Sequence, residues 1–260
     1  MSNYLIFLRK EITENLRTKR LLVLACVFIS FAMLSPLMAR FMGEIFAALM
    51  PADDEASQAI IEMLSNVHWT ESFAQLYGNF TQIGIFAMIF MYMSSIQREV
   101  KTATASLMFS KGLGRTAFVL AKFSAASIVL FIVVAAAIAV NYAYTVLLFE
   151  DIGYMSDIVF GGVSFFVGTV AMLAVVLLCS AVTKGAPASA GLSIGAYFAF
   201  FILGALPRIN VVSPTGLFNA ALTLTFGNTH ENLLLTFASS LLIVAISLFA
   251  AVRALARAEG

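Results

Sequence analysis

Residues 123–149 read FSAASIVLFIVVAAAIAVNYAYTVLLF, and no Asp, Glu, Lys, Arg or His interrupts them. An α-helix rises about 1.5 Å per residue, so a run of this length can cross the roughly 30 Å of hydrocarbon in a bilayer. The rest of the 260-residue chain has the same character, because 61% of its residues are hydrophobic and 11% are charged. Soluble domains carry about 25% charged residues, so the composition predicts an integral membrane protein.

Five further apolar runs flank this one. They cover residues 21–41, 80–96, 160–182, 187–206 and 233–252. The run 80–96 is short and is expected to extend by about one turn at either end to reach spanning length. None has the alternating pattern of transmembrane β-strands, and a helix satisfies its own backbone hydrogen bonds in lipid. We therefore expect an all-α membrane protein, with six transmembrane helices in a single domain over residues 1–260.

Lys and Arg residues indicate the orientation of these spans. With the N-terminus in the cytoplasm, thirteen of the fifteen Lys and Arg residues lie on the cytoplasmic side, and only Arg40 and Arg208 lie outside. By the positive-inside rule, the sequence predicts a multi-pass protein of the inner, cytoplasmic membrane of the cell, with both termini in the cytoplasm.

The spans lack the groups that couple transport to ion gradients. Such transporters hold an ionisable side chain near the bilayer centre. No predicted span has one there, since Arg40 and Lys122 lie at span ends, where long side chains reach the lipid headgroups. If the chain belongs to a pump, we expect its energy to come from a partner.

Residues 1–20, before the first span, have the pattern of an amphipathic helix. Apolar residues recur at spacings of three and four: Leu5, Leu8, Ile12 and Leu16. Charged residues lie on the opposite face: Arg9, Lys10, Glu14 and Arg17. Such a helix lies in the membrane interface. The alternative is a basic flank that only fixes the topology.

Residues 97–122 form a cytoplasmic connection between the second and third spans. Residues 103–109 are expected to make a short helix that Gly112 and Gly114 end. Leu107, Met108 and Phe109 would have no core of their own, which predicts a docking surface for another protein. The spacing differs from that of a phosphate-binding loop, so no nucleotide site is expected.

Several residues of this connection follow a known order: Glu99, Thr102, Leu107, Ser110, Arg115 and Lys122. Together with the amphipathic N-terminal helix and the six spans, this order resembles the type-2 permease subunits of ABC transporters. These are exporter half-units with an N-terminal elbow helix and a cytoplasmic coupling helix. The resemblance implies ATPase coupling through Glu99, Thr102, Ala103, Leu107, Met108, Phe109 and Arg115, and an elbow helix with Leu5, Leu8, Ile12, Leu16 and Arg17.

The resemblance also implies partners and a function. The partners are two ABC ATP-binding subunits, which carry the ATP and Mg²⁺, a second permease copy or paralogue, and membrane lipids, but no nucleic acid. This chain itself would be a non-catalytic permease without a cofactor or metal. The expected substrate is hydrophobic or amphipathic, such as a lipid, a peptide or an antibiotic-like molecule. A non-transporting membrane scaffold or sensor partner is the alternative.

Two outer segments are also distinctive. Residues 43–79 are acidic, and 51–64 carry the signals of a small helix. Within residues 207–231, the stretch 213–226 is too short to cross a membrane and too apolar for a free loop. We expect it to re-enter the membrane or lie on its outer leaflet, as re-entrant helices do in the resembled family. An interfacial loop is the alternative.

Polar residues within the spans suggest a translocation route. The candidates for its lining are Asn79, Gln82, Asn141 and Tyr142. A belt of aromatic residues at the membrane interface explains the tyrosine equally well.

Small residues recur in the fifth span. Gly191, Gly195 and Ala199 form a face that lets helices approach closely, within the chain or across a dimer. In the resembled family the first and fifth spans line the dimer interface. The same stretch spells Gly-x-Ser-x-Gly around Ser193, but a nucleophilic serine there needs a strand-to-helix turn and a nearby histidine. An intramembrane hydrolase that uses Ser193 is therefore the less favoured alternative.

Overall fold

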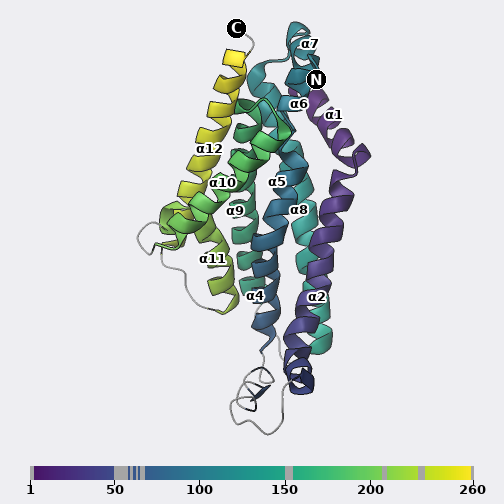
Figure 1. Cartoon of the computed structure of the whole chain (residues 1–260), viewed down its shortest axis with the longest axis vertical. Coiled ribbons are helices and arrows are strands. Elements are labelled where there is room, and N and C mark those ends of the chain that lie inside the picture. The colour runs from purple at the N-terminus through teal and green to yellow at the C-terminus, as the bar shows by residue number, and fades with distance from the viewer. Residues whose placement is uncertain are drawn as a thin grey trace.

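The computed structural model is a bundle of long helices (Figure 1). It describes residues 3–49, 58, 61–62, 64, 68–149, 155–206, 210–227 and 232–258. Within these ranges there is no β-strand, and six helices are long and apolar enough to cross a membrane. The all-α fold and the six candidate spans predicted from the sequence are thus confirmed, as expected for a multi-pass membrane protein.

The elements follow one another along the chain with short connections. The first half contains α1 (Asn3–Arg17), α2 (Arg20–Leu49), α4 (Trp69–Asn79), the π-helix η1 (Phe80–Gly84), α5 (Ile85–Tyr92), α6 (Gln97–Lys101) and α7 (Thr104–Ser110). The second half contains α8 (Arg115–Leu148), α9 (Met155–Val182), α10 (Ala186–Gly204), the 3₁₀-helix η2 (Asn210–Val212), α11 (Thr215–Thr225) and α12 (Leu233–Ala258). Both marked chain ends lie at the end of the bundle that carries α6 and α7, which we call the α7 end (Figure 1).

The second span is longer than the sequence predicts. It runs over Trp69–Lys101, so it begins about three turns before the predicted start at residue 80. Polar residues such as Glu71 lower the hydropathy of this first part. Its apolar residues nevertheless recur on one side and are buried against other helices: Trp69, Phe73, Leu76 and Phe80. Tertiary packing, which local hydropathy does not report, makes this stretch part of the span.

The outer segment predicted over residues 43–79 is correspondingly shorter. Helix α2 continues to Leu49, and α4 begins at Trp69. The small acidic helix predicted over 51–64 falls mostly on residues outside those that the structure describes.

Helix α9 is the centre of the bundle, in contact with α8, α10, α11 and α12. Its Phe165 ring is fully buried. The centroid of this ring lies 5.5 Å from that of Tyr77, 5.6 Å from that of Phe80 and 5.2 Å from that of Phe218. One aromatic cluster therefore joins α4, η1, α9 and α11.

The stretch predicted over 213–226 contains helix α11, which packs against α9 and α4. Two glycines of α9 permit this close contact. A Cβ atom at Gly168 would lie 2.8 Å from the Phe218 ring, and one at Gly161 would lie 2.8 Å from the Thr225 hydroxyl oxygen. Among the described residues, this stretch is thus a packed part of the bundle and not a free loop.

The short helix predicted over 103–109 occurs as α7, one residue later at each end. Ala103 has a left-handed backbone with φ 54°, which separates α6 from α7. The amide of Gly112, at φ 87°, donates to the carbonyl of Phe109, and the amide of Leu113 donates to that of Met108. These bonds are the Schellman motif, in which glycine takes the left-handed position after a helix. Gly112 therefore ends α7, whereas Gly114 is the extended N-cap of α8.

Candidate functional site

The α7 end brings together α1, α6, α7 and the start of α8. Helix α1 packs along α8. The Tyr4 hydroxyl donates to the Ser124 hydroxyl oxygen at 3.0 Å. The Phe7 and Phe118 rings stack with their centroids 5.4 Å apart. The N-terminal helix is therefore fixed to the third span and not only to the first.

Five charged side chains form a buried ionic cluster between these helices. The Nζ atom of Lys122 lies 3.0 Å from Oε1 of Glu11 and 2.8 Å from Oε1 of Glu99. The Nζ atom of Lys10 lies 2.8 Å from Oε1 of Glu11, 2.9 Å from Oε1 of Glu99 and 2.8 Å from Oε2 of Glu14. The cluster consists of Lys10, Glu11, Glu14, Glu99 and Lys122, and it links α1, α6 and α8.

Lys122 differs from its sequence prediction. The sequence places it at a span end, from where its side chain would reach the lipid headgroups. In the structure Lys122 is only 3% exposed and is surrounded by protein. Burying an ammonium group costs several kcal/mol unless oppositely charged partners compensate, and Glu11 and Glu99 supply that compensation. A single sequence does not reveal these partners, because they come from two other elements.

The charges of the site balance. Arg98 adds a third cation, with its Nη2 atom 3.2 Å from Oε1 of Glu14. Burial alone would raise the pKa of Glu14, but its hydrogen bond to the Lys10 ammonium and the nearby positive charges lower it below its usual value. Burial would likewise lower the pKa of Lys10, but its hydrogen bonds to Glu11, Glu14 and Glu99 raise it. Both groups are therefore held in their charged forms.

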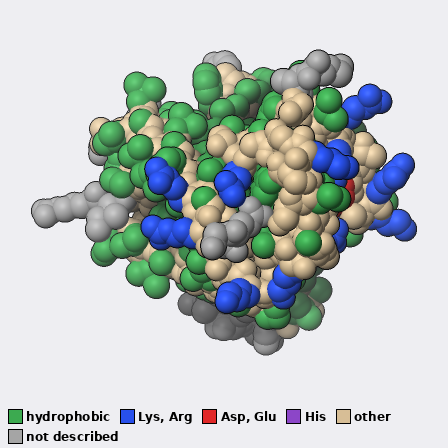
Figure 2. Space-filling model, turned by 90° about the horizontal axis from the view of Figure 1, so that it is seen from above, with side chains coloured by type: hydrophobic (Ala, Val, Ile, Leu, Met, Phe, Trp, Pro, Cys, Tyr) green, Lys and Arg blue, Asp and Glu red, His purple; other side chains and the backbone are tan. Residues whose placement is uncertain are grey.

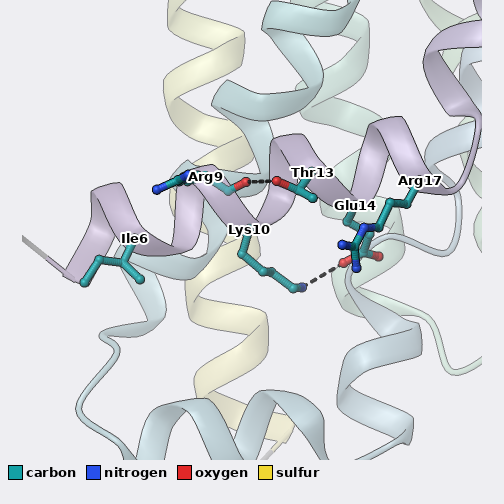
Figure 3. Close-up of a pocket in the computed structure, with 6 residues that line it drawn as sticks. All are labelled: Ile6, Arg9, Lys10, Thr13, Glu14 and Arg17. Atoms are coloured by element: carbon teal, nitrogen blue, oxygen red, sulfur yellow. Dashed lines mark hydrogen bonds and ion pairs between the residues drawn. The ribbon is translucent and has the colours of Figure 1, made fainter.

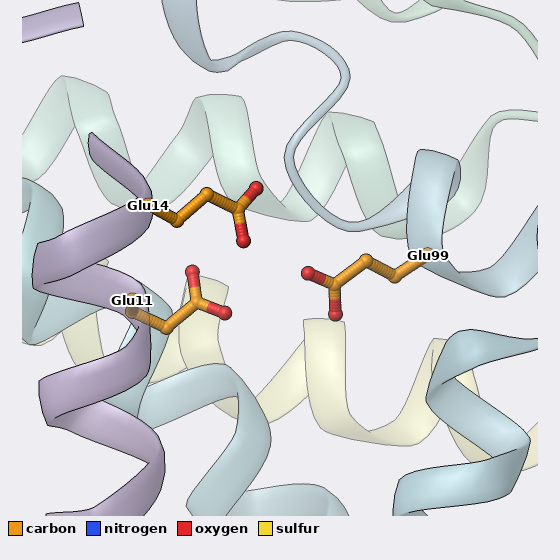
Figure 4. A group of neighbouring side chains, drawn as sticks. All are labelled: Glu11, Glu14 and Glu99. Carbon is orange, nitrogen blue, oxygen red and sulfur yellow. The ribbon is translucent and has the colours of Figure 1, made fainter. Parts of the chain in front are cut away.

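Three carboxylates in one place raise the question of a metal ion. Glu11, Glu14 and Glu99 offer oxygens within 4.8 Å of one another, and Figure 4 shows their side chains pointing toward a common space. The ammonium groups of Lys10 and Lys122 already contact oxygens of these carboxylates at 2.8–3.0 Å. The two lysines supply the positive charge that a metal would bring, so the cluster is interpreted as an ion-pair network.

The structure divides the apolar residues of α7, which the sequence groups as one docking surface. Phe109 turns inward, with its ring centroid 5.4 Å from that of Phe118 in an edge-to-face arrangement. Met108 is half-buried, whereas Leu107 is 58% exposed. Leu107 is thus the projecting side chain, and Phe109 anchors α7 to α8.

The remaining predicted coupling residues have different surroundings. Glu99 is buried within the ionic cluster. Thr102 and Ala103 are exposed at the turn between α6 and α7, where the Thr102 hydroxyl donates to the Arg98 carbonyl at 3.0 Å. The Arg115 guanidinium lies 5.6 Å from the centre of the Phe109 ring, within cation–π range.

Helix α1 has three faces, where the sequence predicts two. Its buried face carries Phe7, Glu11 and Asn15, at a spacing of four. Of the predicted apolar stripe, Leu5 and Leu16 are exposed, and Leu8 and Ile12 are half-buried. Arg17 is exposed, on the third face. The sequence analysis missed the buried face, because a charged and an amide residue on it hide its regular spacing.

The turn from α1 into α2 is also fixed by side chains. Lys19 has a left-handed backbone with φ 58°. The buried Arg20 donates from Nη1 to Oδ1 of Asn15 at 3.3 Å, and its guanidinium lies 5.5 Å from the centre of the Tyr92 ring. These contacts tie the start of the first span to the end of α5.

The candidate lining residues do not share one surface. Asn141 is fully buried, and its amide donates to the Ala32 carbonyl at 3.2 Å while accepting from the Ser72 hydroxyl at 3.3 Å. It therefore holds helices together and does not line a route. The Asn79 amide donates to the Ser35 hydroxyl oxygen at 3.4 Å. Gln82 is exposed on η1, and Tyr142 is half-buried.

A cavity of about 260 Å³ lies between η1, α10 and α11. Its lining residues are Thr81, Phe201, Gly204, Ala205, Thr215, Phe218 and Asn219. The Tyr197 hydroxyl donates to the Thr81 carbonyl at 2.8 Å, so a side chain from α10 satisfies an acceptor of the π-helix. Single π-helical turns often occur at functional sites. The composition of the second span gives no signal for this turn.

The small residues of α10 face away from the rest of the chain. A Cβ atom added at Gly191 or Gly195 would have no described heavy atom within 4 Å, and Ala199 is exposed. Among the described residues, this face is therefore not used for packing. Ser193 lies on the buried side of α10, and His68 contacts the Thr70 hydroxyl at 3.2 Å.

No model of a known protein family matches this chain, and none of the curated proteins compared with it matches.

Proposed function

We propose that this chain is the transmembrane permease subunit of an ATP-driven exporter of the type-2 ABC kind. It would move a hydrophobic or amphipathic substrate across the inner membrane. The observation that supports the proposal best is the double attachment of the α6–α7 connection to the bundle. Phe109 packs on Phe118 of α8, and Glu99 is ion-paired to Lys122 of α8 and to Lys10 of α1. The exposed Leu107 is left for a partner.

These attachments allow a force on α7 to reach the spans. A displaced α7 carries the Phe109 ring against Phe118, near the start of α8. Helix α6 moves Glu99, which pulls on Lys122 and Lys10 together. Because α8 is one continuous helix over Arg115–Leu148, motion at its start is transmitted along its length. Closure of two partner ATPases would thus act on the permease, which itself makes and breaks no bond.

The charge distribution supports a cytoplasmic α7 end. Figure 2 shows Lys and Arg side chains over this end of the molecule and hardly any Asp or Glu. Glu11 and Glu99 are buried there, so the cations dominate the surface. By the positive-inside rule, both termini and α7 then lie in the cytoplasm. Helix α1 would be the interfacial elbow helix.

The open face of α10 and the packed helix α11 complete the proposal. The Gly191 and Gly195 face, which no described residue covers, would pack against a second permease copy or paralogue. Helix α11 would re-enter the membrane from outside, and the cavity beside it, lined by Thr81 and Phe218, would accept part of the substrate.

Leu107 provides the test of this function. The variant Leu107→Asp places a charge on the exposed tip of α7 and should abolish binding of the ATP-binding subunit, while Leu107→Met should retain it. The measurements are ATP hydrolysis that co-purifies with the chain and ATP-driven substrate uptake into inverted vesicles. Insertion and folding of both variants are checked by size-exclusion chromatography. Equal ATPase recovery with Leu107→Asp would overturn the proposal, and ATPase binding without uptake would indicate a scaffold.

A further inference from the structure

The third face of α1 borders a hollow of about 520 Å³. Its lining residues are Ile6, Arg9, Lys10, Thr13, Glu14 and Arg17, and Figure 3 shows them along one side of the helix. A second hollow of about 260 Å³ shares Ile6 and Lys10 with the first and adds residues from the α7 region, including Lys111. The two hollows together follow α1 along most of its length.

The hollow carries positive charge that the protein does not neutralise. Lys10 and Glu14 are ion-paired to each other at 2.8 Å. Within the part of the chain that the structure describes, Arg9 and Arg17 have no carboxylate at ion-pair distance. The Thr13 hydroxyl, between them in sequence, donates to the Arg9 carbonyl at 2.8 Å. Two arginines that are two helical turns apart therefore present free guanidinium groups along the hollow.

The neighbouring face of α1 indicates where the hollow lies relative to lipid. Leu5 and Leu16 are exposed there, at 50% and 53%, and an amphipathic helix buries such a face among the acyl chains at the membrane boundary. Arg9, Thr13 and Arg17 follow within about a quarter of a turn around the helix at 100° per residue. Side chains in that position lie at the level of the lipid headgroups.

We propose that this hollow binds the headgroup of an anionic phospholipid from the cytoplasmic leaflet. Arg9 and Arg17 donate to the phosphate oxygens, since a guanidinium group matches phosphate geometry in paired hydrogen bonds. Ile6, 58% exposed in the same hollow, contacts the apolar part of the lipid. The bound lipid holds α1 in place, and the ionic cluster extends that restraint to α6 and α8. This inference depends on the membrane location of the chain and not on its transport activity.

The apolar face favours a lipid over an acidic protein as the occupant. A protein segment would have to reach the hollow beside exposed leucines that are themselves expected to lie in acyl chains. A phospholipid supplies both the anionic group and the acyl chains from one molecule. Charge and hydrophobicity on adjacent faces of α1 thus match a single ligand.

The test compares lipid binding by two double variants of the full chain. Arg9→Gln with Arg17→Gln removes the cations of the hollow. Arg253→Gln with Arg257→Gln removes two other exposed arginines, on α12, and is the matched control for net charge. Retention of phosphatidylglycerol and of phosphatidylcholine by the purified protein is titrated by native mass spectrometry.

Wild type and the α12 control should bind phosphatidylglycerol more tightly than phosphatidylcholine. Because one arginine near an anionic surface contributes a factor of about five, the α1 double variant should lose roughly 20-fold in phosphatidylglycerol affinity. Equal loss in both double variants, or no preference in wild type, would overturn the proposal. Displacement of the lipid by inorganic phosphate alone would indicate a free-anion site, and displacement by polyglutamate alone an acidic protein partner. Either result would also reject the lipid.

Discussion

The Nζ atom of Lys122 lies 2.8 Å from Oε1 of Glu99, and both side chains are buried. This contact joins the start of the third span to the connection that precedes it. Glu11 brings in α1 through the same lysine at 3.0 Å. Removal of one member of a buried ion pair leaves an uncompensated charge, which costs more than the intact pair contributes. The cluster is therefore a sensitive point of the α7 end.

The variant Lys122→Met should destabilise the protein strongly. Glu11 and Glu99 would then share only Lys10, and removal of one partner from a buried ion pair costs about 3–5 kcal/mol. Unfolding in detergent, followed by circular dichroism, measures the loss. The matched change Lys184→Met replaces an exposed lysine and should alter stability by about 0.5 kcal/mol or less. Similar stabilities of the two variants would show that the cluster does not hold the α7 end together.

Stability should fall on the acid side, in part because of Glu14. Its pKa is lowered in the folded protein, so its contribution is fully present above the unfolded value of about 4.3 and is lost as the pH falls through the folded value. Lys10 has a raised pKa, and its contribution persists at every pH below its unfolded value of about 10.4. Thermal unfolding of wild type and Glu14→Gln from neutral to acid pH measures the difference. The variant should show a shallower acid decline, and parallel curves would contradict this assignment.

The spans could be predicted from the sequence, because lipid imposes one simple requirement on each of them. Residues 123–149 lie almost wholly within α8 for this reason. The first part of the second span could not be predicted, since Trp69 and Phe73 are buried by other helices and the intervening polar residues lower the local hydropathy. Hydropathy detects contact with lipid and not contact with protein.

The ionic cluster also escaped prediction from the sequence. Glu11, Glu99 and Lys122 come from three elements, and their spacing along the chain carries no periodic signal. The sequence did indicate Leu107 and Phe109 as apolar residues without a local core. It could not distinguish the exposed Leu107 from Phe109, because the position of the Phe118 ring decides which residue is covered.

Asn141→Leu should have only a small effect on stability and none on substrate movement. Asn141 hydrogen-bonds to Ser72 and to the Ala32 carbonyl, and such bonds between membrane helices contribute about 0.6 kcal/mol on average and at most about 1.7 kcal/mol. The exposed Gln82 provides the comparison, since Gln82→Leu keeps the fold and changes a residue open to substrate. Detergent unfolding and vesicle uptake measure both variants. Loss of uptake with Asn141→Leu at unchanged stability would identify Asn141 as a lining residue.

Gly168→Ala should destabilise the packing of α11 on α9. The added Cβ atom would lie 2.8 Å from the Phe218 ring and 3.2 Å from the Pro214 carbonyl oxygen, and overpacking of this kind costs about 1–3 kcal/mol. Gly78→Ala is the matched change, because an added Cβ there has no described heavy atom within 4 Å. In a helix interior alanine is favoured over glycine by about 1 kcal/mol. The two variants should therefore shift the unfolding midpoint in opposite directions, and a shift in the same direction would mean that α11 yields easily.

Gly191→Leu combined with Gly195→Leu should leave the single chain folded and prevent its self-association. Neither glycine has a described neighbour within 4 Å of an added Cβ, so larger side chains are accommodated within one chain. Across a close helix pair the same side chains would hold the two backbones apart, since small residues are what permit that approach. Light scattering in detergent gives the oligomeric state, and Ile246→Phe, at an exposed position on α12, controls for added bulk on a lipid-facing helix. The wild type and the Ile246→Phe variant should be dimeric and the double glycine variant monomeric. A dimeric double variant would place the contact between copies elsewhere, and a monomeric wild type would exclude a stable homodimer through α10.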